Sequence, residues 1–85
     1  MVTVGKIVWT EKFEREVRKL GDRSVKSRVR NVVQKIIEDP ELGKPLRFEL
    51  RGERSIRVLS YRLIYAVEAD TLYLLRFEHR KTVYR

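Results

Sequence analysis

The chain has 85 residues and no cysteine, which excludes a disulfide framework, a thiol nucleophile and a cysteine zinc site, and its single histidine argues against an all-protein transition-metal site. Lysine and arginine number 20 against 12 aspartates and glutamates, a formal net charge of +8. Arginine predominates among the basic residues from position 44 onward, and its planar donor fork matches phosphate oxygens, so nucleic acid or ribonucleoprotein is the favoured partner and a thermophile-style charged surface is the alternative.

The length predicts one small domain that spans residues 1–85. Charges interrupt the N-terminal segment where a signal peptide would need an apolar run, and no apolar stretch approaches the ~20 residues of a membrane span. We therefore expect a soluble cytoplasmic protein with no membrane association. No cofactor and no metal are expected either.

The first elements are a strand and a helix. Residues 2–9 are rich in β-branched side chains, which favours an opening strand. Thr10 is suited to cap a helix whose apolar residues recur at i, i+4 and i+7: Phe13, Val17 and Leu20. Gly21 can end this helix in the left-handed conformation.

The second helix has the clearest periodicity in the chain. Asp22 can cap it, and Asp39-Pro40 stops it because proline disfavours the helical region for the residue before it. Its apolar positions are Val25, Val29, Val32, Val33, Ile36 and Ile37. The short connection at 21–22 predicts an antiparallel helical hairpin.

The remaining chain changes to a period of two. Apolar residues alternate over 46–50 and again over 55–60, and two longer strands are expected at 61–68 and 71–79, covered on both faces. A last short strand at 81–84 is also possible. The outline is β-α-α-β-β-β, which predicts an α+β fold with a three- to four-stranded, mainly antiparallel sheet packed on the hairpin.

No catalytic motif with fixed spacing is present, but basic residues and a tyrosine converge near strand ends. Arg57 and Arg62 flank a tight turn, while Arg80, Lys81 and Tyr84 follow the last long strand. Antiparallel pairing can bring Arg62 toward Arg80. An arginine cluster without an interleaved carboxylate suits the stabilisation of a phosphorane-like charge, and its field would lower the pKa of Tyr84 toward proton acceptance.

Each of these residues also has a simpler interpretation. Arg57 and Arg62 fit solvated positions on an open sheet face equally well. His79 fits a polar residue at a strand end, although its pKa also suits acid–base work. Other basic residues are candidates for contact with an RNA backbone or belong to an ordinary solvated surface: Arg28, Arg30, Lys44 and Arg85.

The order of several segments resembles the RelE/ParE superfamily of toxin–antitoxin toxins. The segments are "KLG" at the end of the first helix, "DPELGKPL" before the sheet, "RVLSYRLIYAV" and the closing "HRKTVYR". The resemblance covers essentially the whole chain and agrees with the predicted fold. It implies a RelE-like mRNA interferase, an endoribonuclease that enters the ribosomal A site, where the 2′-OH of the messenger attacks the adjacent phosphate and translation stops.

The resemblance also implies roles for individual residues. Arg62 and Arg80 would stabilise the scissile phosphate, Arg57 would add positive charge beside it, and Tyr84 would stack on a base or accept a proton. His79 is a reserve acid–base candidate.

One position departs from the family pattern. The first of two basic positions on the strand before Arg62 is Ser55 in this chain, with Arg54 or Lys81 as possible substitutes.

Three other functions stay open at this stage: a ParE-like inhibitor of DNA gyrase, a non-catalytic basic RNA-binding module, and an inactive scaffold for an antitoxin. Partners implied by the resemblance are the ribosome, mRNA and a RelB-like antitoxin in a hetero-oligomer. A basic surface invites an acidic, partly disordered antitoxin that folds on binding and covers the arginine cluster or displaces the C-terminal segment.

Overall fold

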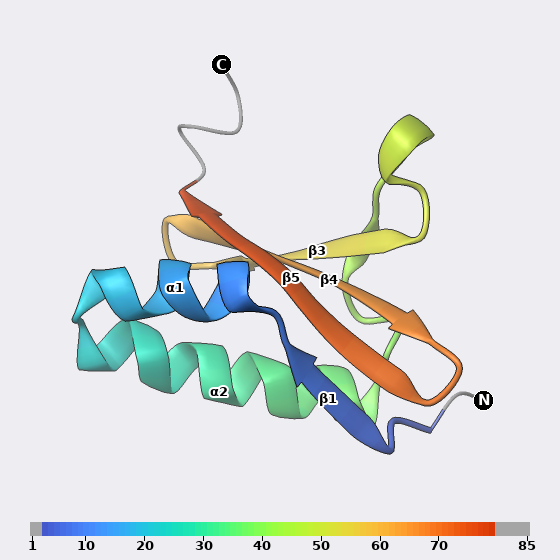
Figure 1. Ribbon diagram of the computed structural model, residues 1–85, viewed down its shortest axis with the longest axis horizontal. Helices are drawn as coiled ribbons and strands as arrows, with labels where there is room; N and C mark the ends of the chain where they lie inside the picture. The colour runs from blue at the N-terminus through green and yellow to red at the C-terminus, as the bar shows by residue number, and fades with distance from the viewer. Residues whose placement is uncertain (1–2, 80–85) are drawn as a thin grey trace.

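The computed structural model describes residues 3–79 of the chain (Figure 1). The elements are β1 (Lys6–Trp9), α1 (Glu11–Leu20), α2 (Arg23–Glu38), β2 (Lys44–Pro45), a 3₁₀ helix η1 (Phe48–Leu50), β3 (Glu53–Val58), β4 (Tyr61–Glu68) and β5 (Thr71–His79). The strand expected at 81–84 lies outside the described residues.

The helical hairpin forms where the sequence predicts it. Thr10 caps α1: its Oγ1 accepts a hydrogen bond from the Phe13 N–H at 3.2 Å and donates one to the Leu74 carbonyl at 2.6 Å. The cap therefore also ties the helix to β5. Gly21 ends α1 at φ 63°, and the Asp22 carboxylate accepts from the Ser24 N–H at the start of α2.

The five strands form one sheet in the order β1-β5-β4-β3-β2. β1 runs parallel to β5, and the other pairs are antiparallel, so the predicted α+β fold is confirmed and the opening strand joins the sheet as its edge. Both helices lie on one face of the sheet (Figure 1). The expectation that helices or other elements cover the central strands on both faces is not met within residues 3–79.

The strand expected over 46–50 is wrong. Of the segment before β3, only the two residues of β2 pair with β3 as a strand. The Leu46 N–H then donates to the Glu53 carbonyl, and the chain continues into η1. Phe48 has φ 58°, outside the extended region, and its side chain is 89% exposed. The apolar residues of 46–50 do alternate, but a segment without a partner strand lacks the hydrogen bonds that stabilise an extended conformation.

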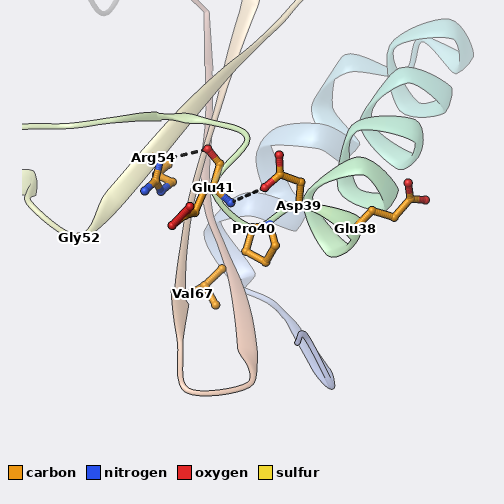
Figure 2. Close-up of a pocket in the computed structure, with 7 residues that line it drawn as sticks. All are labelled: Glu38, Asp39, Pro40, Glu41, Gly52, Arg54 and Val67. Carbon is orange, nitrogen blue, oxygen red and sulfur yellow. Dashed lines mark hydrogen bonds between the residues drawn. The ribbon is translucent and has the colours of Figure 1, made fainter. Parts of the chain in front are cut away.

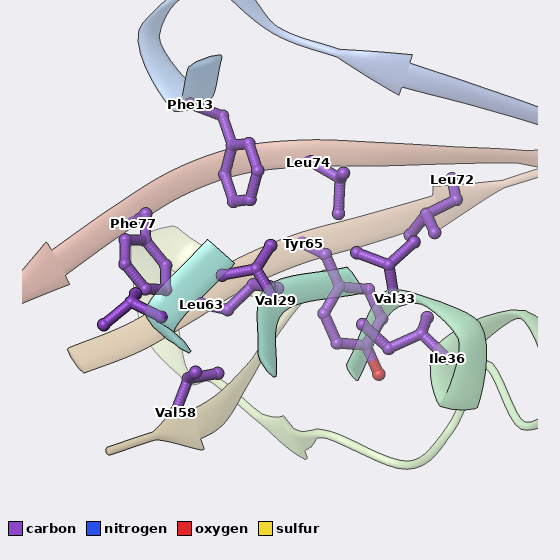
Figure 3. Close-up of a cluster of buried hydrophobic side chains, with 11 residues drawn as sticks. Phe13, Val29, Val33, Ile36, Val58, Leu63, Tyr65, Leu72, Leu74 and Phe77 are labelled. Atoms are coloured by element: carbon purple, nitrogen blue, oxygen red, sulfur yellow. The ribbon is translucent and has the colours of Figure 1, made fainter. Parts of the chain in front are cut away.

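The core lies between the helices and β3, β4 and β5 (Figure 3). Its residues are Phe13, Val25, Val29, Val33, Ile36, Val58, Leu63, Tyr65, Leu72, Leu74 and Phe77. The apolar stripe predicted for α2 supplies four of these residues, so the helix packs with the predicted face inward.

A bulge in β5 decides which side chains of this strand enter the core. Tyr65 of β4 pairs with Leu74, and the next residue back, Ile64, pairs with Arg76, so Leu75 has no opposite residue. The extra residue shifts the alternation by one position. Phe77 therefore packs in the core, and Arg76 and Glu78 project from the opposite face.

Tyr65 anchors the loop after α2 to the sheet. Its hydroxyl accepts a hydrogen bond from the Gly43 N–H at 2.8 Å and donates one to the Pro40 carbonyl at 2.9 Å. A Cβ at position 43 would lie 2.8 Å from a ring carbon of Tyr65, so only glycine fits there. This contact fixes the path of the chain into β2.

Replacing Tyr65 by phenylalanine is expected to lower the free energy of unfolding by about 1–3 kcal/mol, because the Gly43 N–H and the Pro40 carbonyl lose their partner. Burial raises the pKa of Tyr65, so its contribution is full below the unfolded pKa of about 10 and is lost as pH rises through the higher folded pKa. Urea unfolding at neutral and alkaline pH measures both effects.

The matched control is Tyr73→Phe, which removes a hydroxyl from a half-buried position elsewhere in the sheet. The variant Tyr65→Phe should lose less stability than the wild type between pH 9 and pH 11. An alkaline loss equal to that of the wild type would contradict the assigned role of Tyr65.

Candidate functional site

We call the face of the sheet turned away from the helices the open face (Figure 1). Of the predicted site residues within 3–79, it carries Lys44, Arg57 and Arg62. Residues directly opposite each other on neighbouring strands project to the same side, with Cβ atoms about 5 Å apart. The strand register therefore places these charged and polar residues on the open face: Lys44, Glu53, Ser55, Arg57, Arg62, Arg76 and Glu78.

Arg57 and Arg62 form the centre of the site. They lie directly opposite each other on β3 and β4, beside the turn that joins these strands. Arg57 is exposed and Arg62 is half-buried. Like charges in directly opposite positions destabilise a sheet, and a bound anion would relieve the repulsion. The arrangement is thus suited to hold a phosphate.

For the C-terminal basic residues, the described structure shows only where β5 leads. Arg62 lies opposite Glu78 on β5, which is two residues before Arg80 in the sequence. The other predicted residues of this segment lie, like Arg80, outside the described residues: Lys81, Tyr84 and Arg85. Their proximity to Arg62 stays a prediction.

The expectation of an arginine cluster without carboxylates is wrong. Arg76 bridges two acidic residues on the open face: its Nη2 lies 2.7 Å from Glu53 Oε1 and its Nε lies 2.7 Å from Glu78 Oε1. All three side chains are at most 30% exposed. Burial opposes the charge of Arg76, but the hydrogen bonds that its guanidinium donates to both carboxylates outweigh this effect and raise its pKa.

Arg54 does not take the place of the missing basic residue at Ser55. It lies on the other side of β3, and its Nη1 donates to the Gly43 carbonyl at 2.7 Å and to the Glu41 carbonyl at 3.2 Å (Figure 2). Lys44 of β2 lies directly opposite Ser55 on the open face and is exposed. The cation nearest to Ser55 by register therefore comes from a neighbouring strand, a relation that sequence reasoning missed.

A pocket of about 550 Å³ surrounds Arg54 at the C-terminal end of α2 (Figure 2). It is lined by Glu38, Asp39, Pro40, Glu41, Gly52, Arg54 and Val67. The lining contains three carboxylates and a single guanidinium, which already donates to two backbone carbonyls. This charge balance repels a phosphate backbone, so the pocket is a poor site for RNA.

Other predicted residues lie away from the open face. His79 pairs with Tyr61, and their rings meet edge to face with centroids 5.1 Å apart, on the side of β5 that also carries Phe77. Arg28 and Arg30 are exposed on α2, which packs on the face of the sheet opposite the open face. The structure does not bring these three residues together with Arg57 and Arg62.

Residues 3–79 contain neither a cluster of metal ligands nor a membrane-spanning helix. No group of three or more histidine, cysteine, aspartate or glutamate side chains in this range is arranged to hold a metal ion. No helix in the same range is long and apolar enough to cross a membrane.

Comparison with known proteins identifies the family. Residues 7–84 match the family model of the ParE toxin of type II toxin–antitoxin systems, parDE. The chain belongs to the RelE/ParE superfamily. The resemblance found in its sequence segments is therefore confirmed.

Individual members of the superfamily agree with this assignment. Toxin RelG of Mycobacterium tuberculosis is 35% identical over 80 residues, which cover 91% of this chain and 92% of RelG. A chain of the toxin–antitoxin complex RelBE2 from the same species is 33% identical with a TM-score of 0.75, over 88% of this chain and 96% of that one. The YoeB dimer of Staphylococcus aureus, at 18% identity and a TM-score of 0.75 over 87% and 94%, shares the fold.

Proposed function

We propose that this toxin, acting as one domain over residues 1–85, is an endoribonuclease that cuts mRNA in the ribosomal A site and so stops translation. The observation that carries the proposal is the pair Arg57 and Arg62, directly opposite each other on the open face beside the strand that leads to Arg80. Within residues 3–79 the helices cover only the other face, so an extended RNA strand can approach these guanidinium groups.

The chemistry proposed for the site needs no metal. The 2′-OH of the messenger loses its proton and attacks the adjacent phosphorus, and the bond from phosphorus to the 5′-oxygen of the next nucleotide breaks. The products are a 2′,3′-cyclic phosphate and a 5′-OH, whose oxygen takes its proton from water. Arg57, Arg62 and Arg80 stabilise the charge on the phosphorane oxygens, since a guanidinium is a poor proton donor. Tyr84 accepts the proton of the 2′-OH or stacks on a base.

Lys44 completes the positive charge at the position of Ser55. The two residues lie directly opposite each other on the open face, and an ammonium on a flexible stem can reach a neighbouring phosphate of the strand held by Arg57. Its expected contribution is smaller than that of Arg62, because Lys44 is exposed and Arg62 is half-buried.

The test of this proposal is cleavage by the purified chain on ribosomes that carry a defined messenger. We expect cuts within the A-site codon, a 2′,3′-cyclic phosphate on the upstream fragment and no cutting of the same messenger without ribosomes. Mapping both new ends by primer extension and by ligation specific for cyclic phosphate reads the result. Intact messenger at stoichiometric toxin would refute the ribonuclease.

A second candidate function is inhibition of DNA gyrase. The carboxylates of Glu53 and Glu78 reduce the positive potential of the open face, which favours a surface that binds protein over one that binds RNA. Stalled gyrase and DNA damage in cells, with messengers uncut, would identify this activity. Salt-dependent RNA binding without a cyclic phosphate would identify a non-catalytic RNA-binding module.

We propose that the natural partner of the toxin is an acidic, partly disordered antitoxin in a cytoplasmic hetero-oligomer. The similar RelBE2 structure is a toxin–antitoxin complex, and the net charge of +8 favours an acidic partner. Such a chain would cover Arg57 and Arg62 or displace the segment after β5. Coexpression of the neighbouring reading frame should then relieve growth arrest.

A further inference from the structure

The segment 47–51 forms a projecting tip with a phenylalanine at its end. Phe48 is 89% exposed, the highest value among the large apolar side chains of residues 3–79. It also has φ 58°, a left-handed conformation that is unfavourable for a bulky side chain. Neither feature helps folding, so the tip has the character of a functional element.

The tip is held by its own backbone. The Leu50 N–H donates to the Arg47 carbonyl at 3.2 Å, and the Arg51 N–H donates to the Phe48 carbonyl at 3.1 Å. Gly52 follows at φ 98°, which returns the chain to β3. The short turn thus holds the backbone beneath the exposed ring, which limits the backbone entropy that a contact would cost.

The surroundings of Phe48 are basic. Arg47 and Arg51 flank it in sequence and are exposed, with Glu49 as the only acidic residue of the segment. In Figure 1 the tip rises on the side of the sheet away from the helices, at the end where β3 begins, and Arg57 lies near the other end of β3. Leu50, 42% exposed, adds apolar surface to the same segment.

We infer that Phe48 stacks on an unpaired base of RNA while Arg47 and Arg51 contact the phosphates on either side of that base. An exposed aromatic ring between arginines matches the way proteins hold single-stranded RNA, with a stacked base and neutralised phosphates. An acidic protein groove would accept the ring and the two cations as well, and the antitoxin-binding measurement below separates that occupant from RNA. The inference rests on the proposed function for the choice of RNA, and it assigns the tip a substrate contact remote from Arg62.

Fluorescence provides a direct readout of stacking. The chain has a single tryptophan, Trp9, so the double variant Trp9→Phe, Phe48→Trp carries one tryptophan at the tip. The first probe is a short single-stranded RNA with 2′-O-methyl groups, which cannot undergo attack by its own 2′-OH. We expect quenching of the tip tryptophan on binding. Binding of this RNA without any change in the tip fluorescence would overturn the inference.

Affinity separates stacking from simple apolar contact. Phe48→Ala and Phe48→Leu are expected to weaken RNA binding by about 5- to 100-fold, and Phe48→Tyr is expected to keep it, because only an aromatic face stacks on a base. Leu42→Ala, at an apolar residue that is 45% exposed outside the tip, is the matched control and should bind as the wild type does. Equal binding by Phe48→Leu and the wild type would refute stacking.

Two further arms identify the source of the base and keep the proposals apart. Quenching by empty ribosomes assigns the base to ribosomal RNA, and quenching only by ribosomes that carry a messenger assigns it to mRNA. Either result supports the inference.

Failure of the ribonuclease proposal appears as RNA binding with intact messenger, whereas failure of the present inference appears as cleavage with unchanged affinity in Phe48→Ala. Loss of antitoxin binding alone in that variant would overturn it in favour of a protein contact.

Discussion

Replacing Arg62 by alanine is expected to reduce ribosome-dependent messenger cleavage by about 100-fold or more, the usual effect of removing one preorganised donor to a developing oxyanion. Arg62 is half-buried on the central strand β4, with Arg57 and Glu78 opposite it on the two neighbouring strands. A cation in this position is less screened than one on the rim. The rate of cleavage at saturating ribosome concentration measures the effect.

A graded series tests whether position on the open face decides the loss. Arg57→Ala should cost less than Arg62→Ala, and Lys44→Ala should cost only a few-fold, because both residues are exposed. Arg62→Lys should recover part of the rate, since it keeps the charge without the planar fork. Arg23→Ala, at an exposed residue of α2, is the control. Cleavage by Arg62→Ala at the wild-type rate, with an unchanged unfolding midpoint, would eliminate the site.

The helical half of the fold is accessible from sequence because its signals are local. Caps at Thr10 and Asp22, a left-handed glycine between the helices and an unbroken apolar stripe on α2 act within a few residues of the elements they define. The closeness of Arg57 and Arg62 is equally local, since a two-residue turn joins their strands. Both features can be predicted without knowing which distant segments pair.

The composition of the open face depends on a long-range feature that no local pattern contains. Strict alternation through β5 would place Arg76 and Glu78 on the same side as Leu74, toward the helices. The bulge at Leu75 reverses this and brings both charged residues to the open face. Only the register with β4 reveals the bulge, so the place of Glu78 and of its partner Arg76 on the open face could not be predicted.

The strand predicted over 46–50, where the structure has the tip, is wrong for a related reason. Its apolar residues alternate as those of a strand do, but alternation alone does not provide the second strand that would satisfy the backbone. With no core to face, Phe48 and Leu50 project into solvent. A pattern typical of a buried strand thus contains Phe48, the most exposed large apolar residue of the described chain.

Replacing Arg76 by alanine is expected to lower the free energy of unfolding by about 2–3 kcal/mol. The change leaves Glu53 and Glu78, 22% and 30% exposed, without the cation that lies 2.7 Å from each carboxylate. Arg76→Lys should recover only part of the loss, because one ammonium cannot match both in-plane contacts of a guanidinium. The triple variant Glu53→Gln, Arg76→Met, Glu78→Gln removes all three charges and should approach wild-type stability. Urea unfolding at pH 7 measures the series.

The same substitution should also impair cleavage, by a route that stability does not explain. Glu78, once released from Arg76, lies directly opposite Arg62 and can neutralise the guanidinium on which the phosphate depends. Arg76→Ala should therefore lose at least tenfold in cleavage rate at temperatures where it remains folded. Adding Glu78→Gln should restore most of the rate without restoring the wild-type stability. If the double variant cleaved as slowly as Arg76→Ala, Arg76 itself would contact the substrate, and its bridge to Glu78 would not be what positions the site.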